Sequence, residues 1–152
     1  MLSSDEVVHR LIAGDDEVRA ALEERFGTTE RGRMAEIVFP DPAELEWLEA
    51  LLHPRVRREY QAWLATVTAG VAVVEVPLLY ETGADELFDL VVVVTAPEEL
   101  RRARAGAEVE RRSARLKPDE QKVAQADFAY VNDGSLEDLD AFVASVLAGL
   151  AK

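Results

Sequence analysis

Arginine and lysine side chains are concentrated in one part of this otherwise acidic chain. Of its 17 Lys and Arg residues, eight lie between Arg101 and Lys122, where only four acidic residues occur, whereas the net charge of the chain is −13. Guanidinium groups stay charged and offer planar, paired donors that match phosphate oxygens. A basic segment in an acidic protein therefore suits a small, highly phosphorylated ligand. A solvated helix face without a ligand is the alternative, and composition alone favours neither.

Two apolar, β-branched runs precede the basic segment, at residues 71–76 and 90–95. Neither run alternates between apolar and polar residues, which predicts strands buried on two faces, as in a parallel sheet flanked by helices. The order is a strand, a crossover segment, a second strand and then a basic helix. This order would place arginines at the carboxyl ends of the strands, where open α/β sheets bind ligands. We therefore expect a nucleotide-handling α/β core around residues 70–105.

The composition excludes several classes of protein. The 152 residues are 49% hydrophobic and 31% charged, which suits one domain with a buried core. Without cysteine there are no disulfides or thiolate metal sites, and two histidines argue against a histidine-based metal site. The negative charge argues against nucleic-acid binding. No apolar run approaches the roughly 20 residues of a membrane span, and the N-terminus does not resemble a signal peptide, so we expect a cytoplasmic protein.

Helical patterns dominate the N-terminal half. Helices are predicted at residues 5–13 and 16–26, and Asp41-Pro42 supplies a cap followed by proline at the first helical position. We expect His53-Pro54 to interrupt that helix. Residues 128–131 are a third short strand, which leaves a thin sheet compared with the about four to six strands that are usual.

No short catalytic motif is present: G-x-x-x-x-G-K-S/T, the dinucleotide fingerprint, G-x-S-x-G and zinc signatures are all absent. A distributed pattern is more specific. Six segments, in order and with plausible spacing, resemble the dephospho-CoA kinase family: LSSDEVVHRL (2–11), IVFPDP (37–42), LEALLHPRVR (48–57), VPLLYETG (76–83), VVVVTAPEEL (91–100) and ADFAYVNDGSLEDL (126–139).

The resemblance covers essentially all 152 residues and implies a P-loop-kinase-like α/β fold, a parallel sheet flanked by helices. It implies a helical substrate subdomain at about residues 14–68, a core at 70–97 and 123–152, and an arginine-rich lid at 98–122. Family members begin with a strand and a glycine-rich P-loop, about 25–30 residues that would precede Met1. That strand lies in the middle of the family's sheet, so we expect the central strand to be missing here.

The resemblance assigns phosphoryl-transfer roles to three residues. The family's D-A-D motif matches Ser3-Ser4-Asp5, where the first aspartate is serine and the second is retained. Asp5 would then be the catalytic base, or positioning group, for the attacking hydroxyl. Arg102 and Arg112 match lid arginines that would hold the phosphates of ATP. From its position alone, Asp5 could instead complement the dipole of the helix that it begins.

Three further residues match the family's binding segments. Asn132 lies in the loop after the last strand, which borders the adenine of ATP in the family, although Asn132-Asp133-Gly134 could be a plain turn. His53 matches a His-Pro pair in the substrate subdomain, and Glu81 follows a strand end near the expected site. Both would contact dephospho-CoA. His53 could equally be a structural residue, and Glu81 could cap a turn.

The implied activity is phosphorylation of the 3′-hydroxyl of dephospho-CoA by ATP with Mg²⁺, the last step of coenzyme A synthesis. Because the phosphate cradle and its lysine are missing from this sequence, we expect catalysis to be lost or very weak. Two alternatives remain. The chain could be a catalytically dead module that binds CoA or nucleotides, or a related nucleotide-kinase-like phosphotransferase with another acceptor.

Overall fold

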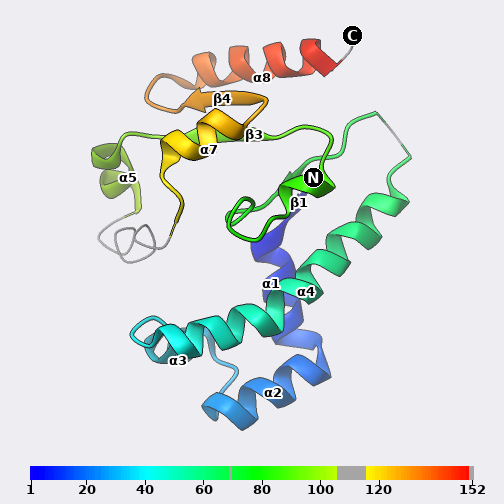
Figure 1. Cartoon of the computed structure of the whole chain (residues 1–152), viewed down its shortest axis with the longest axis vertical. Coiled ribbons are helices and arrows are strands. Elements are labelled where there is room, and N and C mark those ends of the chain that lie inside the picture. Colours follow the sequence, from blue (N-terminus) through cyan, green and yellow to red (C-terminus); the bar gives the residue numbers. More distant parts are fainter. Residues whose placement is uncertain (69, 106–115, 151–152) are drawn as a thin grey trace. The chain divides into compact units, whose positions relative to one another are not determined.

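The computed structural model describes residues 1–68, 70–105 and 116–150, in two compact units, Met1–Pro77 and Leu78–Lys152. Figure 1 shows their elements. The first unit contains β1 (Leu2–Ser3), α1 (Ser4–Gly14), α2 (Asp16–Phe26), α3 (Arg31–Val38), α4 (Pro42–Thr66) and β2 (Val74–Glu75). The second contains η1 (Asp85–Leu87), β3 (Val92–Thr95), α5 (Glu98–Ala105), α7 (Asp119–Gln125), β4 (Phe128–Val131) and α8 (Leu136–Leu150).

Helix caps and an apolar core define the first unit. Asp15 caps α2 by accepting a hydrogen bond from the backbone N–H of Val18 (3.0 Å), and Asp41 caps α4 by accepting one from Ala43 (2.9 Å). Both helix starts confirm the sequence-based expectation. Helix α1 packs against α2 and α4, and α3 packs against α4. Val7, Val18 and Leu22 are the largest fully buried side chains of the described residues.

Helix α4 continues through Pro54, so the predicted interruption at His53-Pro54 is wrong. Proline removes one backbone hydrogen bond from a helix interior, but Pro54 is exposed, and the buried side chains Leu52 and Val56 lie on either side of it. The Arg55 guanidinium also donates to the Leu51 carbonyl (2.8 Å). Packing on both sides of the proline therefore outweighs its local cost.

The described strands form two separate parallel pairs. β1 pairs with β2, beginning at Leu2↔Val74, and β3 pairs with β4, from Val92↔Phe128 to Thr95↔Val131. The parallel α/β arrangement is confirmed. The first predicted strand is shorter than expected, because only Val74–Glu75 of residues 71–76 have a pairing partner among the described residues.

Helix α8 packs along β4 in the second unit, as Figure 1 shows. The rings of Tyr130 and Phe142 stack with centroids 4.8 Å apart, and a Cβ on Gly149 would lie 3.2 Å from the Phe128 ring. On the neighbouring strand β3, Val92 and Val94 remain 44% and 53% exposed. Burial on two faces, which the unbroken valine run predicted, is therefore wrong for β3, because the packing against α8 runs through β4.

A reciprocal cap starts α8. The backbone N–H and hydroxyl of Ser135 donate to Asp138 Oδ2 (2.8 and 2.7 Å), and the backbone N–H of Asp138 donates to the Ser135 hydroxyl (3.2 Å). These hydrogen bonds lower the pKa of Asp138. Gly134 leaves room for this cap, since a Cβ there would lie 2.6 Å from Asp138 Oδ2.

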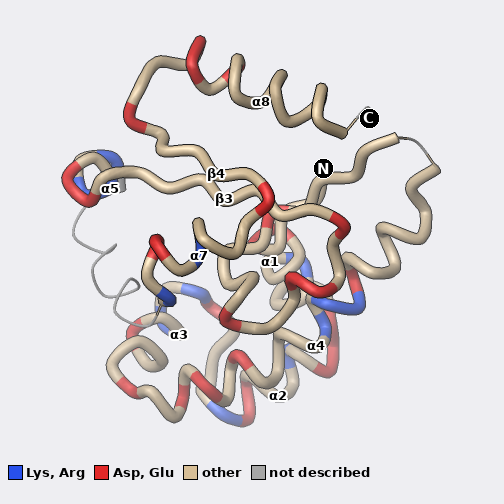
Figure 2. The backbone as a smooth tube through the Cα atoms, turned by 45° about the horizontal axis from the view of Figure 1, so that its top comes forward, with Lys and Arg blue, Asp and Glu red and all other residues tan. Residues whose placement is uncertain are grey.

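Charged residues are unevenly distributed over the helices, as Figure 2 shows. Helices α2 and α4 carry both acidic and basic residues, whereas α8 carries three acidic residues near its start and no lysine or arginine. Within residues 1–68, 70–105 and 116–150, no helix has both the length and the apolar character needed to cross a membrane.

Candidate active site

Asp5 lies in the first turn of α1, immediately after β1. Since β1 is one of two parallel strands, Asp5 stands at the carboxyl end of a parallel strand, where open α/β sheets place their ligand sites. Its side chain is exposed and makes no hydrogen bond or ion pair with the described residues. The carboxylate is therefore available to a ligand.

His53 lies near the middle of α4, in the same unit as Asp5. Its ring is half-buried, and burial lowers its pKa, although Glu49, one turn earlier, opposes the shift. A neutral imidazole is therefore favoured at neutral pH. Helices α1 and α4 pack together, but no hydrogen bond joins Asp5 to His53 in the part of the chain that the structure describes.

Glu81 lies in the turn before η1, in the second unit, and is tied to two lysines. Glu81 Oε1 accepts from Lys122 Nζ (2.7 Å) and from the backbone N–H of Lys117 (3.0 Å). Lys117 Nζ in turn donates to the Tyr80 carbonyl (2.9 Å). Burial raises the pKa of Glu81, but the hydrogen bonds from Lys122 and Lys117 outweigh burial, and the net pKa is lowered. Glu81 is therefore ionised and anchored to the start of α7.

The other sequence-predicted residues of the second unit lie at the ends of β3, β4 and α5. Arg102 is exposed on α5 and forms an ion pair with Glu98 (2.8 Å). The backbone N–H of Asn132 donates to the Thr95 carbonyl (2.7 Å), and the Asn132 carbonyl accepts from the Arg104 guanidinium (3.3 Å). This brings the loop after β4 close to α5. Arg112 lies outside the described residues.

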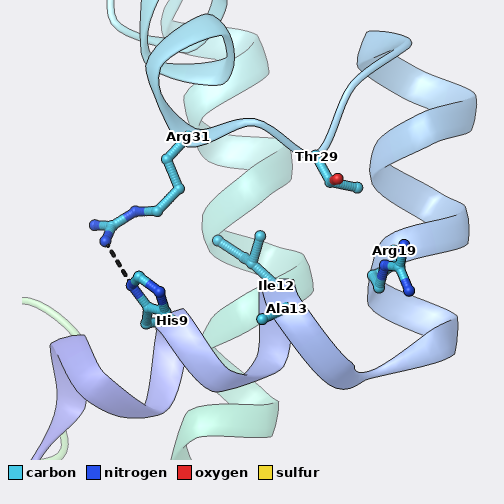
Figure 3. A pocket seen from close by; sticks show the side chains of 6 residues that line it. All are labelled: His9, Ile12, Ala13, Arg19, Thr29 and Arg31. Atoms are coloured by element: carbon cyan, nitrogen blue, oxygen red, sulfur yellow. Dashed lines mark hydrogen bonds between the residues drawn. The ribbon is translucent and has the colours of Figure 1, made fainter.

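Sequence reasoning missed a basic hollow on the first unit. It has a volume of about 380 Å³, and six residues line it: His9, Ile12, Ala13, Arg19, Thr29 and Arg31. Figure 3 shows that they come from α1, α2, the loop after α2 and the start of α3, with Arg31 pointing to His9. A sequence signal was available for one of them, because His9 is four residues after Asp5 and therefore shares its helix face.

The described residues offer no resident metal centre: none of them form a group of three or more His, Asp or Glu that could hold a metal ion.

Comparison of the structure places the chain in a class. A crystal structure of TT1252 from Thermus thermophilus superimposes with a TM-score of 0.78 and 34% sequence identity, covering 98% of this chain and 83% of that one. The fold is that of the P-loop kinases, α/β phosphotransferases that act on nucleotides and related substrates.

The sequence comparisons identify the family within that class. The family model of dephospho-CoA kinase matches residues 2–138. The dephospho-CoA kinase of Brucella melitensis biotype 1 is 36% identical over 167 residues, and that of Rhodopseudomonas palustris is 38% identical over 165 residues. Each match covers 98% of this chain and 82% of the relative. The chain belongs to the dephospho-CoA kinase family, so the resemblance drawn from the six sequence segments is confirmed.

Proposed function

We propose that this chain binds dephospho-CoA beside α1 and presents its 3′-hydroxyl for phosphorylation by ATP. The family is one of kinases that use ATP. The observation that carries the proposal is the position of Asp5, an unpaired, exposed carboxylate at the carboxyl end of a parallel strand. Coenzyme A synthesis is a metabolic reaction, and we place it in the cytoplasm.

Asp5 would accept the proton of the 3′-hydroxyl as that oxygen attacks the γ-phosphorus of ATP. Arg102 and Arg112 would hold the transferring phosphates, and Asn132 would border the adenine. These roles follow the family pattern. The link between the Asn132 loop and α5 supports them, since it brings two of the segments concerned together.

His53 and Glu81 would contribute to binding of dephospho-CoA. The half-buried, neutral ring of His53 suits a contact with an uncharged part of that substrate. Glu81 has a structural role as well, because Lys122 and Lys117 hold one of its oxygens. Mg²⁺ would arrive bound to ATP and bridge its β- and γ-phosphates.

We also propose that phosphoryl transfer by these 152 residues alone is weak or absent. The sequence contains no G-x-x-x-x-G-K-S/T segment. In P-loop kinases the backbone of that segment cradles the phosphates, its lysine contacts them, and its hydroxyl binds Mg²⁺. Binding of the acceptor does not depend on those groups.

Isothermal titration calorimetry with dephospho-CoA and with MgATP, in separate titrations, tests the proposal together with a coupled assay for ADP release. We expect dephospho-CoA to bind, MgATP to bind weakly or not at all, and ADP release to be near background. No binding of dephospho-CoA would contradict the assigned acceptor. Normal turnover would contradict the proposed impairment. Transfer to a different nucleotide acceptor would favour a related kinase activity.

The role of Asp5 is tested by Asp5→Asn, with Glu6→Gln as a matched control in the same helical turn. We expect Asp5→Asn to abolish any residual ADP release, because general base catalysis typically contributes about 10²–10⁴-fold. The affinity for dephospho-CoA should change little in either variant. Equal ADP release by the two variants, at a rate above background, would show that Asp5 serves the helix and not the reaction.

A further inference from the structure

The basic hollow of the first unit has the lining of an anion site. Arg19, Arg31 and His9 surround it, Thr29 adds a hydroxyl, and no acidic residue is among its lining residues. Figure 3 shows Ile12 between the His9–Arg31 pair on one side and Arg19 with Thr29 on the other. Two arginines thus line one hollow in a chain of net charge −13.

The donors of this hollow are largely unused. Arg31 Nη1 lies 3.0 Å from His9 Nδ1. Because arginine can only donate, His9 Nδ1 must accept, and the ring proton of the neutral imidazole lies on Nε2. Arg31 retains its other guanidinium donors. The side chain of Arg19 makes no hydrogen bond or ion pair with any described residue, so its donors are available as well.

Nearby acidic residues are engaged elsewhere. Glu30, next to Arg31, forms an ion pair with Arg33 (3.0 Å), and Asp15, at the start of α2, accepts from the backbone N–H of Val18. Neither of these carboxylates forms an ion pair with Arg31 or Arg19 among the described residues. A volume of about 380 Å³ lies within the roughly 300–1,000 Å³ of small-molecule sites.

We propose that this hollow binds the diphosphate group of dephospho-CoA, an inference that rests on the proposed function and adds a subsite to it. Asp5 and His9 are four residues apart on α1, so they lie on one face of the helix, one turn of about 5.4 Å apart. The 3′-hydroxyl of dephospho-CoA and its 5′-diphosphate are attached to the same ribose. A hydroxyl held at Asp5 therefore brings the diphosphate within reach of His9 and Arg31.

Charge and geometry both favour a diphosphate over an uncharged ligand. Two guanidinium groups and an imidazole N–H offer several donors to the oxygens of a doubly anionic group. Ile12 and Ala13 supply a small apolar wall beside them. A neutral nucleoside would leave both arginines without a counter-charge.

The first experiment follows the two histidines of the chain by NMR while inorganic diphosphate is added. His9 lines the hollow and His53 does not, so His53 serves as the internal reference for His9. We expect the ring signals of His9 to shift with saturation and those of His53 to stay in place. If diphosphate moves neither ring, or both equally, the hollow is not an anion site and the inference is overturned.

The second experiment measures the affinity for dephospho-CoA in Arg31→Gln and Arg19→Gln, with Arg33→Gln as the control. Arg33 lies on the same helix as Arg31, is 72% exposed and pairs with Glu30. We expect Arg31→Gln to weaken binding about tenfold or more, as expected for loss of a hydrogen bond to a charged group, and Arg33→Gln to weaken it less than about twofold. Affinity for adenosine, which lacks the diphosphate, should be unchanged in all variants.

The outcomes separate this inference from the proposed function. If wild type binds dephospho-CoA and Arg31→Gln binds it equally well, the subsite is wrong and the proposed function stands. Equal weakening by Arg31→Gln and Arg33→Gln indicates a general charge effect and overturns the subsite too. If wild type does not bind dephospho-CoA, the proposed function is overturned, and so is the assignment of the diphosphate of dephospho-CoA to the hollow. Circular dichroism spectra of the variants establish that each is folded.

Discussion

The two units of the chain differ in what holds them together. Of the thirteen buried apolar side chains among the described residues, eleven belong to Met1–Pro77. The second unit, Leu78–Lys152, contributes Tyr80 and Ala84. The helices of the first unit thus surround a core of their own, as a self-supporting domain does.

The second unit relies more on polar contacts. Glu81 pairs with Lys122 (2.7 Å) and Arg101 with Asp119 (2.8 Å), and each pair connects segments far apart in the sequence. Many of its large apolar side chains remain exposed, including Leu136 (79%) and Leu147 (51%) of α8. This comparison shows that the first unit is stabilised mainly by apolar burial and the second unit more by charged anchors.

The largest expected effect is on the core of the first unit. Leu22→Ala removes a fully buried side chain and should lower the free energy of unfolding by about 2–5 kcal/mol. Leu147→Ala in α8 is the control in the second unit. Since that side chain is half-exposed, its loss should cost less than about 1 kcal/mol. Urea denaturation followed by circular dichroism measures the free energy of unfolding of both variants. Equal decreases would contradict the proposed difference between the two units.

An intermediate effect is expected from the anchor of the second unit. Glu81→Gln keeps the size of the side chain but removes the charge that pairs with Lys122, whose side chain is only 13% exposed. We expect a loss of about 1–3 kcal/mol. The control is Glu98→Gln, which breaks the exposed pair with Arg102 and should cost no more than about 0.5 kcal/mol. If Glu98→Gln proved as destabilising as Glu81→Gln, the charged anchor would have no special role.

The contribution of Glu81 should depend on pH with a definite sign. Hydrogen bonds from Lys122 and Lys117 outweigh burial and lower the pKa of Glu81 in the folded state. The stabilisation is therefore fully present above the ordinary value of 4.5 and is lost as the pH falls through the lowered pKa of the folded state. The stability difference between wild type and Glu81→Gln should shrink on acidification below that value. A difference that grows there would contradict the assigned cause.

The smallest expected effect on stability concerns Asp5. It lies in the first turn of α1, where a negative charge favours the helix dipole, so Asp5→Asn should cost about 0.3–1 kcal/mol at most. Thermal unfolding of this variant and of Glu6→Gln measures it. Such a small loss would leave the first unit folded, so that a loss of phosphoryl transfer in Asp5→Asn could be assigned to chemistry. A loss comparable to that of Leu22→Ala would make Asp5 a structural residue.

Local signals predicted much of the fold because several helices and strands carry their own start and stop residues. Asp15 and Asp41 cap the helices that follow them, and β4 has the predicted bounds. The predictions were wrong where contacts between residues far apart in the sequence determine the length of a helix or strand. Pro54 does not break α4, because Leu52 and Val56 are buried on both sides of it. Only two of the residues 71–76 are in a strand, since strand length depends on the pairing partner and not on valine content.

The candidate site was predictable in part for the same reason. The position of Asp5 in the first turn of a helix followed from one local segment and was confirmed, whereas its role stays a prediction. The basic hollow was not foreseen, because His9, Arg19 and Arg31 come from three helices and share no sequence spacing. Only the packing of α1 with α2, and of the loop that follows, brings these side chains together.

The parallel pair β3–β4 has a consequence for the behaviour of the protein at high concentration. Each strand has one edge without a hydrogen-bonded neighbour among the described residues, and Val92, Val94 and Val131 are about half-exposed. Unpaired edges of valine-rich strands can add a strand from a second copy. The net charge of −13 opposes this encounter at neutral pH. As the carboxylates become protonated, that repulsion weakens, and edge-to-edge association of two copies becomes more favourable.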